Sequence, residues 1–124
     1  MNYLLGDALI RMKNAKIAGN DEFVVPYTKL NFSVFKAILK LGYLTDLKKE
    51  GTIISARLAR KNKSYLLDNL KIVSRPGFRV YKDNQELRAM KGPFDYVIST
   101  NKGIYTQKEA FKANLGGELI VELS

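Results

Sequence analysis

The predicted loop from residue 99 to residue 103 concentrates hydrogen-bonding groups. It carries two hydroxyls, an amide, an ammonium and a glycine, supplied by Ser99, Thr100, Asn101, Lys102 and Gly103. Small donors and acceptors of this kind suit contacts with base edges and 2′-hydroxyls of irregular RNA. The same composition also fits a plain surface turn, so both interpretations stay open. A phosphate-binding P-loop is excluded, because its longer glycine-rich spacing ending in Gly-Lys-Ser/Thr is absent.

Catalytic chemistry has few residues to work with. The chain has 124 residues without cysteine or histidine, which removes thiolate nucleophiles, the commonest general base and the commonest zinc ligand. A serine nucleophile at Ser99 would have only Lys102 nearby as a base. We therefore predict a protein that is not an enzyme and that needs no cofactor and no metal. A small hydrolase using carboxylates and lysine is the competing hypothesis, and sequence alone does not bring two carboxylates together.

Net charge is the abnormal feature of the composition. Apolar residues make up 46% of the chain, as in ordinary globular proteins, but 21 Lys and Arg face only 12 Asp and Glu, a net charge of +9. Such an excess attracts polyanions, and nucleic acid is the usual one. Residues 1–66 carry +7 and residues 67–124 carry +2. We therefore expect the first half to supply most of the contacts to phosphate.

One stripe of polar residues could make such contacts. Lys29, Ser33, Lys36 and Lys40 stand at i, i+4, i+7 and i+11 of a predicted helix, where like charges cost roughly 0.2–0.5 kcal/mol per pair. A phosphate backbone would offset that cost. An ordinary solvated helix face explains the stripe equally well. No apolar run is long enough to span a bilayer, and Arg11 interrupts the N-terminal apolar stretch where a secretory signal would lie, so we expect no membrane contact.

Hydrophobic periodicity predicts an αβαββ unit in the first half. A helix over residues 3–16 is followed by a strand over Glu22–Pro26. A second helix ends at Gly42 and two strands follow it, Tyr43–Lys49 and Thr52–Arg60. The expected buried stripe of this second helix is Leu30, Val34, Ala37, Ile38 and Leu41.

For the second half we predict a linker over residues 61–69, followed by a mostly β lobe with one or two short helices. Expected strands are Leu70–Ser74, Phe78–Tyr81, Phe94–Ser99 and Glu118–Leu123. Pro76-Gly77 suits a type II turn. Asp83 with Glu86, and Thr106 with Glu109, have the spacing of helix capping boxes. The fold class is therefore α+β in two small lobes, with domains at 1–66 and 67–124.

Four stretches resemble a known family. They are Asp7–Ala15, Pro26–Leu30, Ser74–Tyr81, and Ser99–Thr106 followed by Leu115–Glu118. In order and spacing they are similar to bacterial small-subunit ribosomal protein number eight, the S-eight family, over nearly the whole chain. Three positions depart from the family pattern: Asn101 replaces a serine, Tyr105 replaces a common methionine, and residues 92–95 replace a glycine-rich start of the strand.

The resemblance implies a structural constituent of the small ribosomal subunit in the cytoplasm. Such a protein is a primary rRNA-binding protein that binds the central domain of small-subunit rRNA, supports its assembly and touches neighbouring ribosomal proteins. An alternative is translational repression, because some members bind their own messenger RNA through the same surface. The residues that the resemblance places against RNA are Thr28, Lys29, Tyr81, Ser99, Thr100, Asn101, Lys102, Gly103, Gly116, Gly117 and Glu118.

Two threonines are expected to have different roles, one in folding and the other in RNA binding. Thr106 is expected to cap a helix with its hydroxyl. Thr100 is expected to lie in the loop with no helix to cap, and the resemblance places it against RNA.

Overall fold

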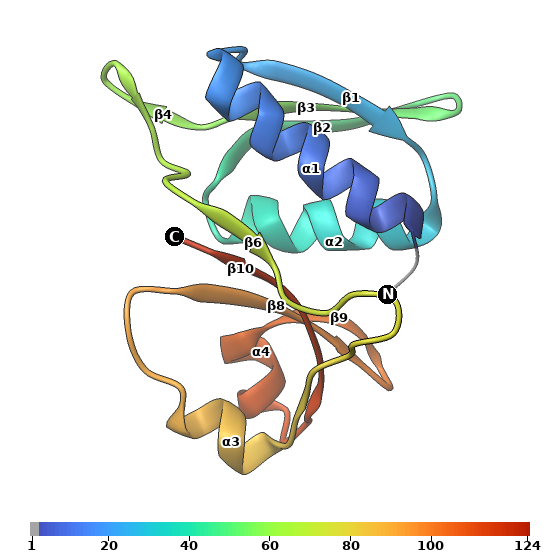
Figure 1. The fold of residues 1–124 in the computed structure, drawn as a ribbon, viewed down its shortest axis with the longest axis vertical. Helices are drawn as coiled ribbons and strands as arrows, with labels where there is room; N and C mark the ends of the chain where they lie inside the picture. The colour runs from blue at the N-terminus through green and yellow to red at the C-terminus, as the bar shows by residue number, and fades with distance from the viewer. Residues whose placement is uncertain (1–2) are drawn as a thin grey trace.

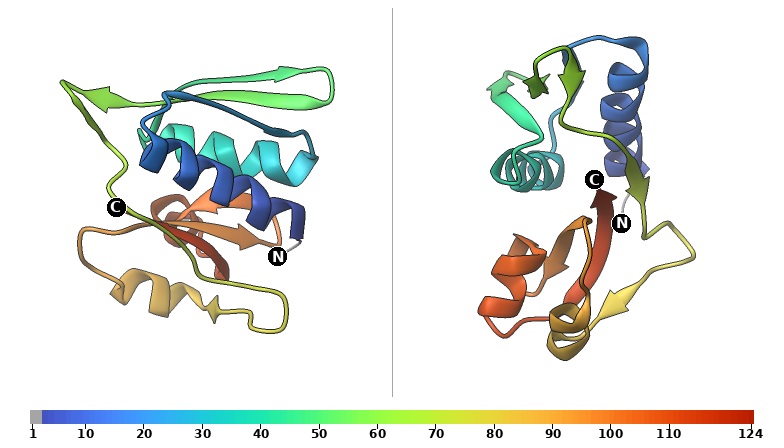
Figure 2. Two further views of the ribbon diagram at one scale, coloured as in Figure 1. Left: turned by 45° about the horizontal axis from the view of Figure 1, so that its top comes forward. Right: turned by 90° about the vertical axis from the view of Figure 1, so that its left-hand side faces the viewer.

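The N-terminal half folds into two helices and a three-stranded antiparallel sheet. The computed structural model describes residues 3–124 and shows two lobes, one above the other (Figure 1). The sheet has the order β1-β3-β2, and both helices lie on one of its faces (Figures 1 and 2). The elements of this lobe are α1 (Tyr3–Ala18), β1 (Glu22–Pro26), α2 (Lys29–Lys40), β2 (Leu44–Glu50) and β3 (Ile53–Leu58).

Burial follows the predicted periodicity in α1 and β3. The apolar stripe of α1, from Leu5 to Ala15, is buried, and so are alternate residues of β3. In α2 the predicted stripe was partly wrong. Phe35 and Asn31 are buried, whereas Leu30 and Leu41 are only half-buried. Asn31 fits inside because its Nδ2 donates to the carbonyl of Pro26 at 3.0 Å, which the hydrophobic pattern does not register.

The predicted linker over residues 61–69 was wrong in part, because a small hairpin occupies its first half. Strands β4 (Arg60–Lys61) and β5 (Ser64–Tyr65) pair with each other. The Arg60 guanidinium and the Tyr65 hydroxyl both donate to Asp21 Oδ1, at 2.7 and 2.8 Å, which fixes the hairpin against the N-terminal lobe. Leu67, in the second half, is buried in the core.

The C-terminal half forms a five-stranded sheet with two short helices on one face. The strand order is β6-β10-β8-β9, and β7 also pairs with β10. Helices α3 and α4 pack against a small cluster of buried residues that includes Leu87, Ile98 and Leu119. The elements are β6 (Leu70–Ile72), β7 (Tyr81–Lys82), α3 (Asn84–Ala89), β8 (Asp95–Thr100), β9 (Gly103–Thr106), α4 (Gln107–Lys112) and β10 (Gly117–Leu123).

Turns and caps in this half agree with the sequence better than strand boundaries do. Gly77 has φ of 84°, as a type II turn requires, and Arg75 and Phe78 exchange two backbone hydrogen bonds of 2.9 Å around it. Both capping boxes are present. The predicted strand over Phe78–Tyr81 was wrong, because regular pairing begins only at Tyr81. Residues 75–78 form the turn, and only single backbone hydrogen bonds at Val73 and Val80 connect its two sides to β10.

One core joins the two lobes. The larger cluster of buried residues includes α1 and α2 side chains together with Val97, Val121 and Leu123 of the C-terminal sheet. The Tyr43 hydroxyl donates to Asp95 Oδ2 at 2.6 Å across the same boundary. Burial raises the pKa of Tyr43, and the neighbouring Asp95 carboxylate raises it further. The two sheets are therefore held in a fixed relation by apolar packing and a polar contact.

Candidate nucleic-acid interface

The polar segment over residues 99–103 is a tight β-hairpin, not the loop that the sequence predicted. Ser99 and Thr100 end β8, Asn101 and Lys102 form the turn, and Gly103 opens β9. Thr100 holds the turn: its Oγ1 accepts from the Lys102 N–H at 3.1 Å and donates to the Gly103 carbonyl at 2.8 Å. Thr100 caps no helix, as expected, but its hydroxyl stabilises the turn, which the sequence did not indicate. Cross-strand pairing presents Asn101 and Lys102 to solvent on a fixed support.

A row of three side chains crosses the sheet beside this turn. Tyr81 lies opposite Glu118, and Glu118 lies opposite Ser99. Directly opposed residues of antiparallel strands project to the same face, and successive residues alternate between faces. Because Leu119 and Ile98 lie under α3 and α4, the row lies on the opposite face of the sheet. Pairing thus brings together residues that are far apart in sequence.

Exposure along the row is uneven. Tyr81 is 61% exposed, Ser99 is half-buried, and Glu118 is only 8% exposed. Most of the Glu118 side chain is therefore shielded, which the sequence did not indicate. Tyr81 offers an aromatic face of the kind that stacks on unpaired bases.

Gly116 and Gly117 are required by the packing of the backbone. A Cβ at Gly116 would lie 2.6 Å from the Lys82 carbonyl oxygen, and a Cβ at Gly117 would collide with the Ser99 carbonyl. The glycines therefore let β10 lie close to both β7 and β8. By allowing this close approach, the two glycines position Tyr81 of β7 and Ser99 of β8 on either side of β10.

The N-terminal residues Thr28 and Lys29 lie at the start of α2. Thr28 is the N-cap, and its side chain accepts from the Asn31 N–H at 2.9 Å. Lys29 is exposed. In Figure 1 this end of α2, the β8–β9 turn and the yellow segment around residue 77 all lie at the right of the molecule, and the left-hand view of Figure 2 agrees. Both lobes thus present candidate residues at one end.

The predicted lysine stripe is shorter than its spacing indicated. Lys40 Nζ lies 3.3 Å from Glu109 Oε2 of α4, so it forms an ion pair between the lobes. The backbone N–H of Thr106 lowers the pKa of Glu109, and Lys40 lowers it further. Lys36 lies over the Phe32 ring at 4.7 Å, and remains exposed. Lys29 and Lys36 are the cations of the stripe that form no ion pair within residues 3–124.

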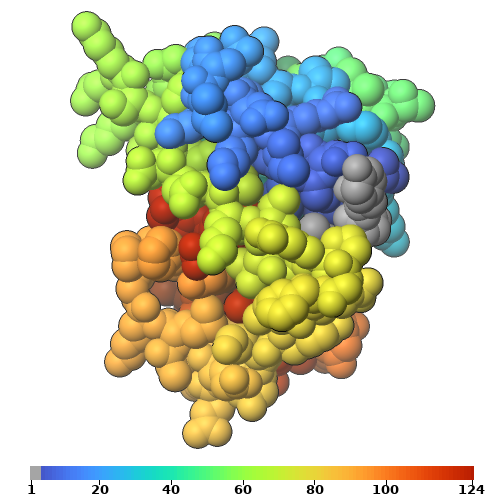
Figure 3. Space-filling model, viewed as in Figure 1, coloured from blue at the N-terminus to red at the C-terminus, as the bar shows by residue number. Residues whose placement is uncertain are grey.

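Sequence reasoning missed one exposed aromatic residue. Phe78 is 69% exposed, between the exposed Arg75 and Arg79. Figure 3 shows this segment, in yellow, on the front of the C-terminal lobe. The sequence carried a signal for this exposure, because Phe78 directly follows the turn at Pro76-Gly77 and lies between two arginines. Stacking and charge are combined here, as in many RNA-binding surfaces.

Residues 3–124 contain neither a membrane-spanning helix nor a cluster of possible metal ligands. No helix in this range is both long and apolar enough to cross a membrane. Within the same range, no group of three or more possible side-chain ligands could hold a metal ion.

The fold and the site together define a small, basic RNA-binding protein of two α+β lobes. The charge, the rigid polar turn and the exposed aromatic residues all fit this class. The chain belongs to the ribosomal protein S8 family, whose profile matches residues 4–123. The family consists of structural, non-enzymatic proteins of the small ribosomal subunit, which lies in the bacterial cytoplasm among ribosomal RNA and other ribosomal proteins.

Curated relatives agree with this assignment. The chain is 36% identical over 126 residues to the small ribosomal subunit protein uS8 of Trichormus variabilis, a match that covers 96% of this chain and 95% of the relative. It is 37% identical over 122 residues to the protein of the same name from Caldanaerobacter subterraneus, with 94% and 92% covered. The expected α+β fold class and the family resemblance are both confirmed.

Proposed function

We propose that this protein is a primary binding protein for the central domain of small-subunit rRNA and supports the assembly of that domain. The observation that carries the proposal is the row from Tyr81 to Ser99 continuing into the exposed turn, at the end of the molecule where α2 begins. We also propose residues 1–66 and 67–124 as its two units. The proposed RNA contacts are Thr28, Lys29, Tyr81, Ser99, Thr100, Asn101, Lys102, Gly103, Gly116, Gly117 and Glu118.

The two lobes have different tasks in this proposal. Lys29 and Lys36 contact phosphates, which position the RNA but carry no sequence information. Asn101, with an amide that both donates and accepts, contacts base edges or 2′-hydroxyls in an irregular helix. Its support in the β8–β9 hairpin limits the entropy lost when RNA binds.

Two substitutions test this division of tasks. Lys29→Ala should weaken binding to a central-domain rRNA fragment and to a random hairpin by about the same factor. Asn101→Ala should reduce the preference for the central-domain fragment by about tenfold, because each good contact to a base edge contributes roughly 1–3 kcal/mol of discrimination. Asn20→Ala removes the same atoms from another exposed position, just after α1, and serves as the control. Unchanged preference in Asn101→Ala would show that this turn does not read RNA.

Repression of translation is the second candidate and rests on the family resemblance. It would use the same surface and differ only in the RNA that is bound. Footprinting on the protein's own messenger RNA separates the two functions. If the wild-type protein protects a segment of the messenger and Asn101→Ala does not, repression is supported. If only rRNA is protected, repression is excluded.

A further inference from the structure

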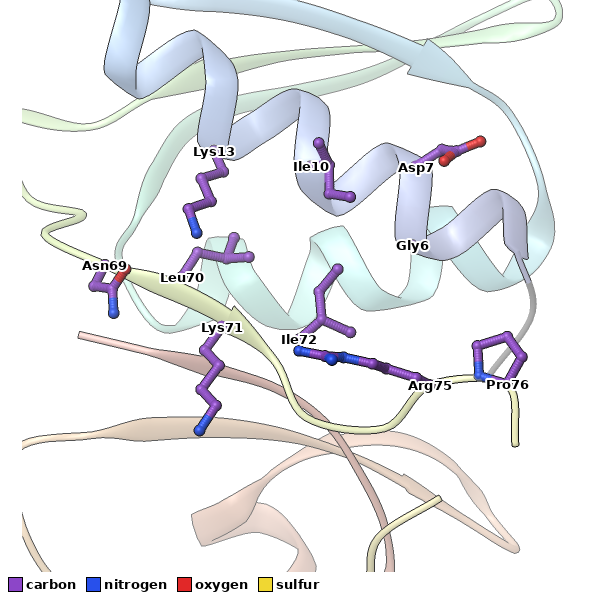
Figure 4. A pocket seen from close by; sticks show the side chains of 10 residues that line it. All are labelled: Gly6, Asp7, Ile10, Lys13, Asn69, Leu70, Lys71, Ile72, Arg75 and Pro76. Atoms are coloured by element: carbon purple, nitrogen blue, oxygen red, sulfur yellow. The ribbon is translucent and has the colours of Figure 1, made fainter. Parts of the chain in front are cut away.

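A groove of about 550 Å³ lies between α1 and the segment that contains β6 (Figure 4). Its volume is within the range of pockets that bind ligands. Ile10 of α1 lies above it and is 46% exposed, and Leu70 and Ile72 line the side formed by β6. The groove is separate from the β8–β9 turn.

One wall of the groove is a free sheet edge. Within residues 3–124, β6 is the terminal strand of its sheet and pairs only with β10. Asn69 and Ser124 exchange two hydrogen bonds of 3.0 Å, and the Val73 N–H donates to the Ile120 carbonyl at 3.0 Å. The alternation of an antiparallel ladder therefore turns the backbone groups of residues 69, 71 and 73 toward β10. The N–H and C=O groups of Leu70 and Ile72 point the other way, along the open edge.

The side chains around this edge divide into an apolar side and a basic side. Figure 4 shows Leu70 and Ile72 pointing toward the helices, and Lys71 pointing to the opposite side of the strand. Arg75 extends beneath Ile72, and Lys13 points down from α1 toward Asn69. Within residues 3–124 Lys13, Lys71 and Arg75 form no ion pair, although Lys71 lies directly opposite Glu122 of β10 in the register of the two strands. Asp7, the acidic residue of the lining, points away from the groove.

We propose that this groove binds an extended, acidic segment of another protein, which adds to the edge of β6 as a further strand. Main-chain hydrogen bonds to Leu70 and Ile72 supply the binding mode known as strand addition. Because side chains of a strand alternate between faces, apolar residues of the segment pack toward Ile10. Acidic residues on its other face lie near Lys71 and Arg75. The partner sequence therefore alternates apolar and acidic residues.

A peptide fits this groove better than RNA does. The wall offers backbone donors and acceptors in the spacing of a β-strand, with an apolar side chain above it. RNA would bring a charged backbone against Ile10 and Ile72, where burial without matched hydrogen bonds is costly. The basic side alone would suit either partner. The combination of sheet edge, apolar side and cations selects an acidic strand.

The test uses the full-length protein and a labelled synthetic peptide, Val-Glu-Val-Glu-Val-Glu-Val. Fluorescence anisotropy should show saturable binding, and hydrogen exchange at the amides of Leu70 and Ile72 should slow when the peptide is bound. A peptide with alternate backbone nitrogens methylated, and one with lysine in place of glutamate, should each bind at least about tenfold more weakly.

Matched charge reversals locate the site. Lys71→Glu should weaken peptide binding by about tenfold, whereas Lys61→Glu, the same change on the exposed β4–β5 hairpin, should leave it unchanged. Equal binding of the methylated peptide, unchanged exchange at Leu70 and Ile72, or no saturable binding would each overturn the proposal. The proposal would also be overturned if an RNA hairpin displaced the peptide and if Lys71→Glu weakened RNA binding by the same factor as peptide binding. The groove would then be a nucleic-acid contact.

Discussion

Removing the hydroxyl and methyl group of Thr106 should destabilise the fold much more than removing the same atoms from Thr100. Thr106 is 6% exposed, and its Oγ1 accepts from the Glu109 N–H at 3.3 Å. Thr106→Ala loses this N-cap, which costs about 1 kcal/mol. It also leaves a small cavity in a buried place, worth roughly another 1 kcal/mol. The free energy of unfolding should therefore fall by about 2 kcal/mol in total.

Thr100→Ala also removes two hydrogen bonds, but both lie at the surface. Its Oγ1 contacts the Lys102 N–H and the Gly103 carbonyl, and water can replace the hydroxyl at each. A loss of roughly 0.5 kcal/mol in stability is expected, at the low end for an intramolecular hydrogen bond. Affinity for the central-domain fragment should fall by about tenfold, because the turn that presents Asn101 loses its clamp.

Urea denaturation and RNA binding measured on the same protein preparations check both numbers. Thr100→Ser and Thr106→Ser keep the hydroxyl, so they should restore RNA affinity and the cap respectively. The reasoning about the cap fails if Thr106→Ala unfolds at the wild-type urea concentration. Equal losses of stability in the two alanine variants, with RNA affinity unchanged in Thr100→Ala, would leave the β8–β9 turn a purely structural element.

The net charge, the close backbone packing at Gly117 and the half-buried Tyr96 hydroxyl each give a further prediction. With about five phosphates contacted, the logarithm of the RNA association constant should fall with log salt at a slope of about −4, and a slope near zero in a salt titration would exclude phosphate as the main source of affinity. Gly117→Ala should cost about 3 kcal/mol or more, because its Cβ meets the backbone of Ser99 and no side chain can move aside; urea denaturation at the wild-type midpoint would contradict this. Burial, together with the carboxylate of Glu122, raises the pKa of Tyr96 to about 12, above its unfolded value of about 10. Its stabilisation is therefore complete below pH about 10 and is lost as the pH rises toward 12, so Tyr96→Phe should flatten the decline in unfolding free energy measured between pH 9 and pH 11.

Local features of the fold were predictable from the sequence. The two capping boxes, the turn at Pro76-Gly77 and the end of α2 at Gly42 all depend on groups within a few residues of one another. The residue types at these positions therefore predict the caps and turns without knowledge of the rest of the fold. The apolar stripe of α1 was predictable for the same reason, since it reflects the period of a single helix.

The candidate site was predictable in part, through the family resemblance. It named Gly116 and Gly117, but their physical role depends on Lys82 and Ser99, which approach them only in the folded sheet. It named Glu118 without indicating that this side chain is nearly buried. The hairpin at Thr100 was missed because a two-residue turn looks like a loop until its strands are paired.

Charge and composition by themselves indicated a nucleic-acid partner and left few residue types for catalysis, because both are sums over residues that need no coordinates. Tertiary structure alone decided which of those charges remain free. Lys40 forms an ion pair with Glu109, 69 positions away in the chain, while Lys71 forms no ion pair within residues 3–124 and lies in the edge strand β6 of its sheet. Such outcomes depend on strand order and on the packing of one lobe against the other, and contacts between distant residues leave no periodic signal in a single sequence.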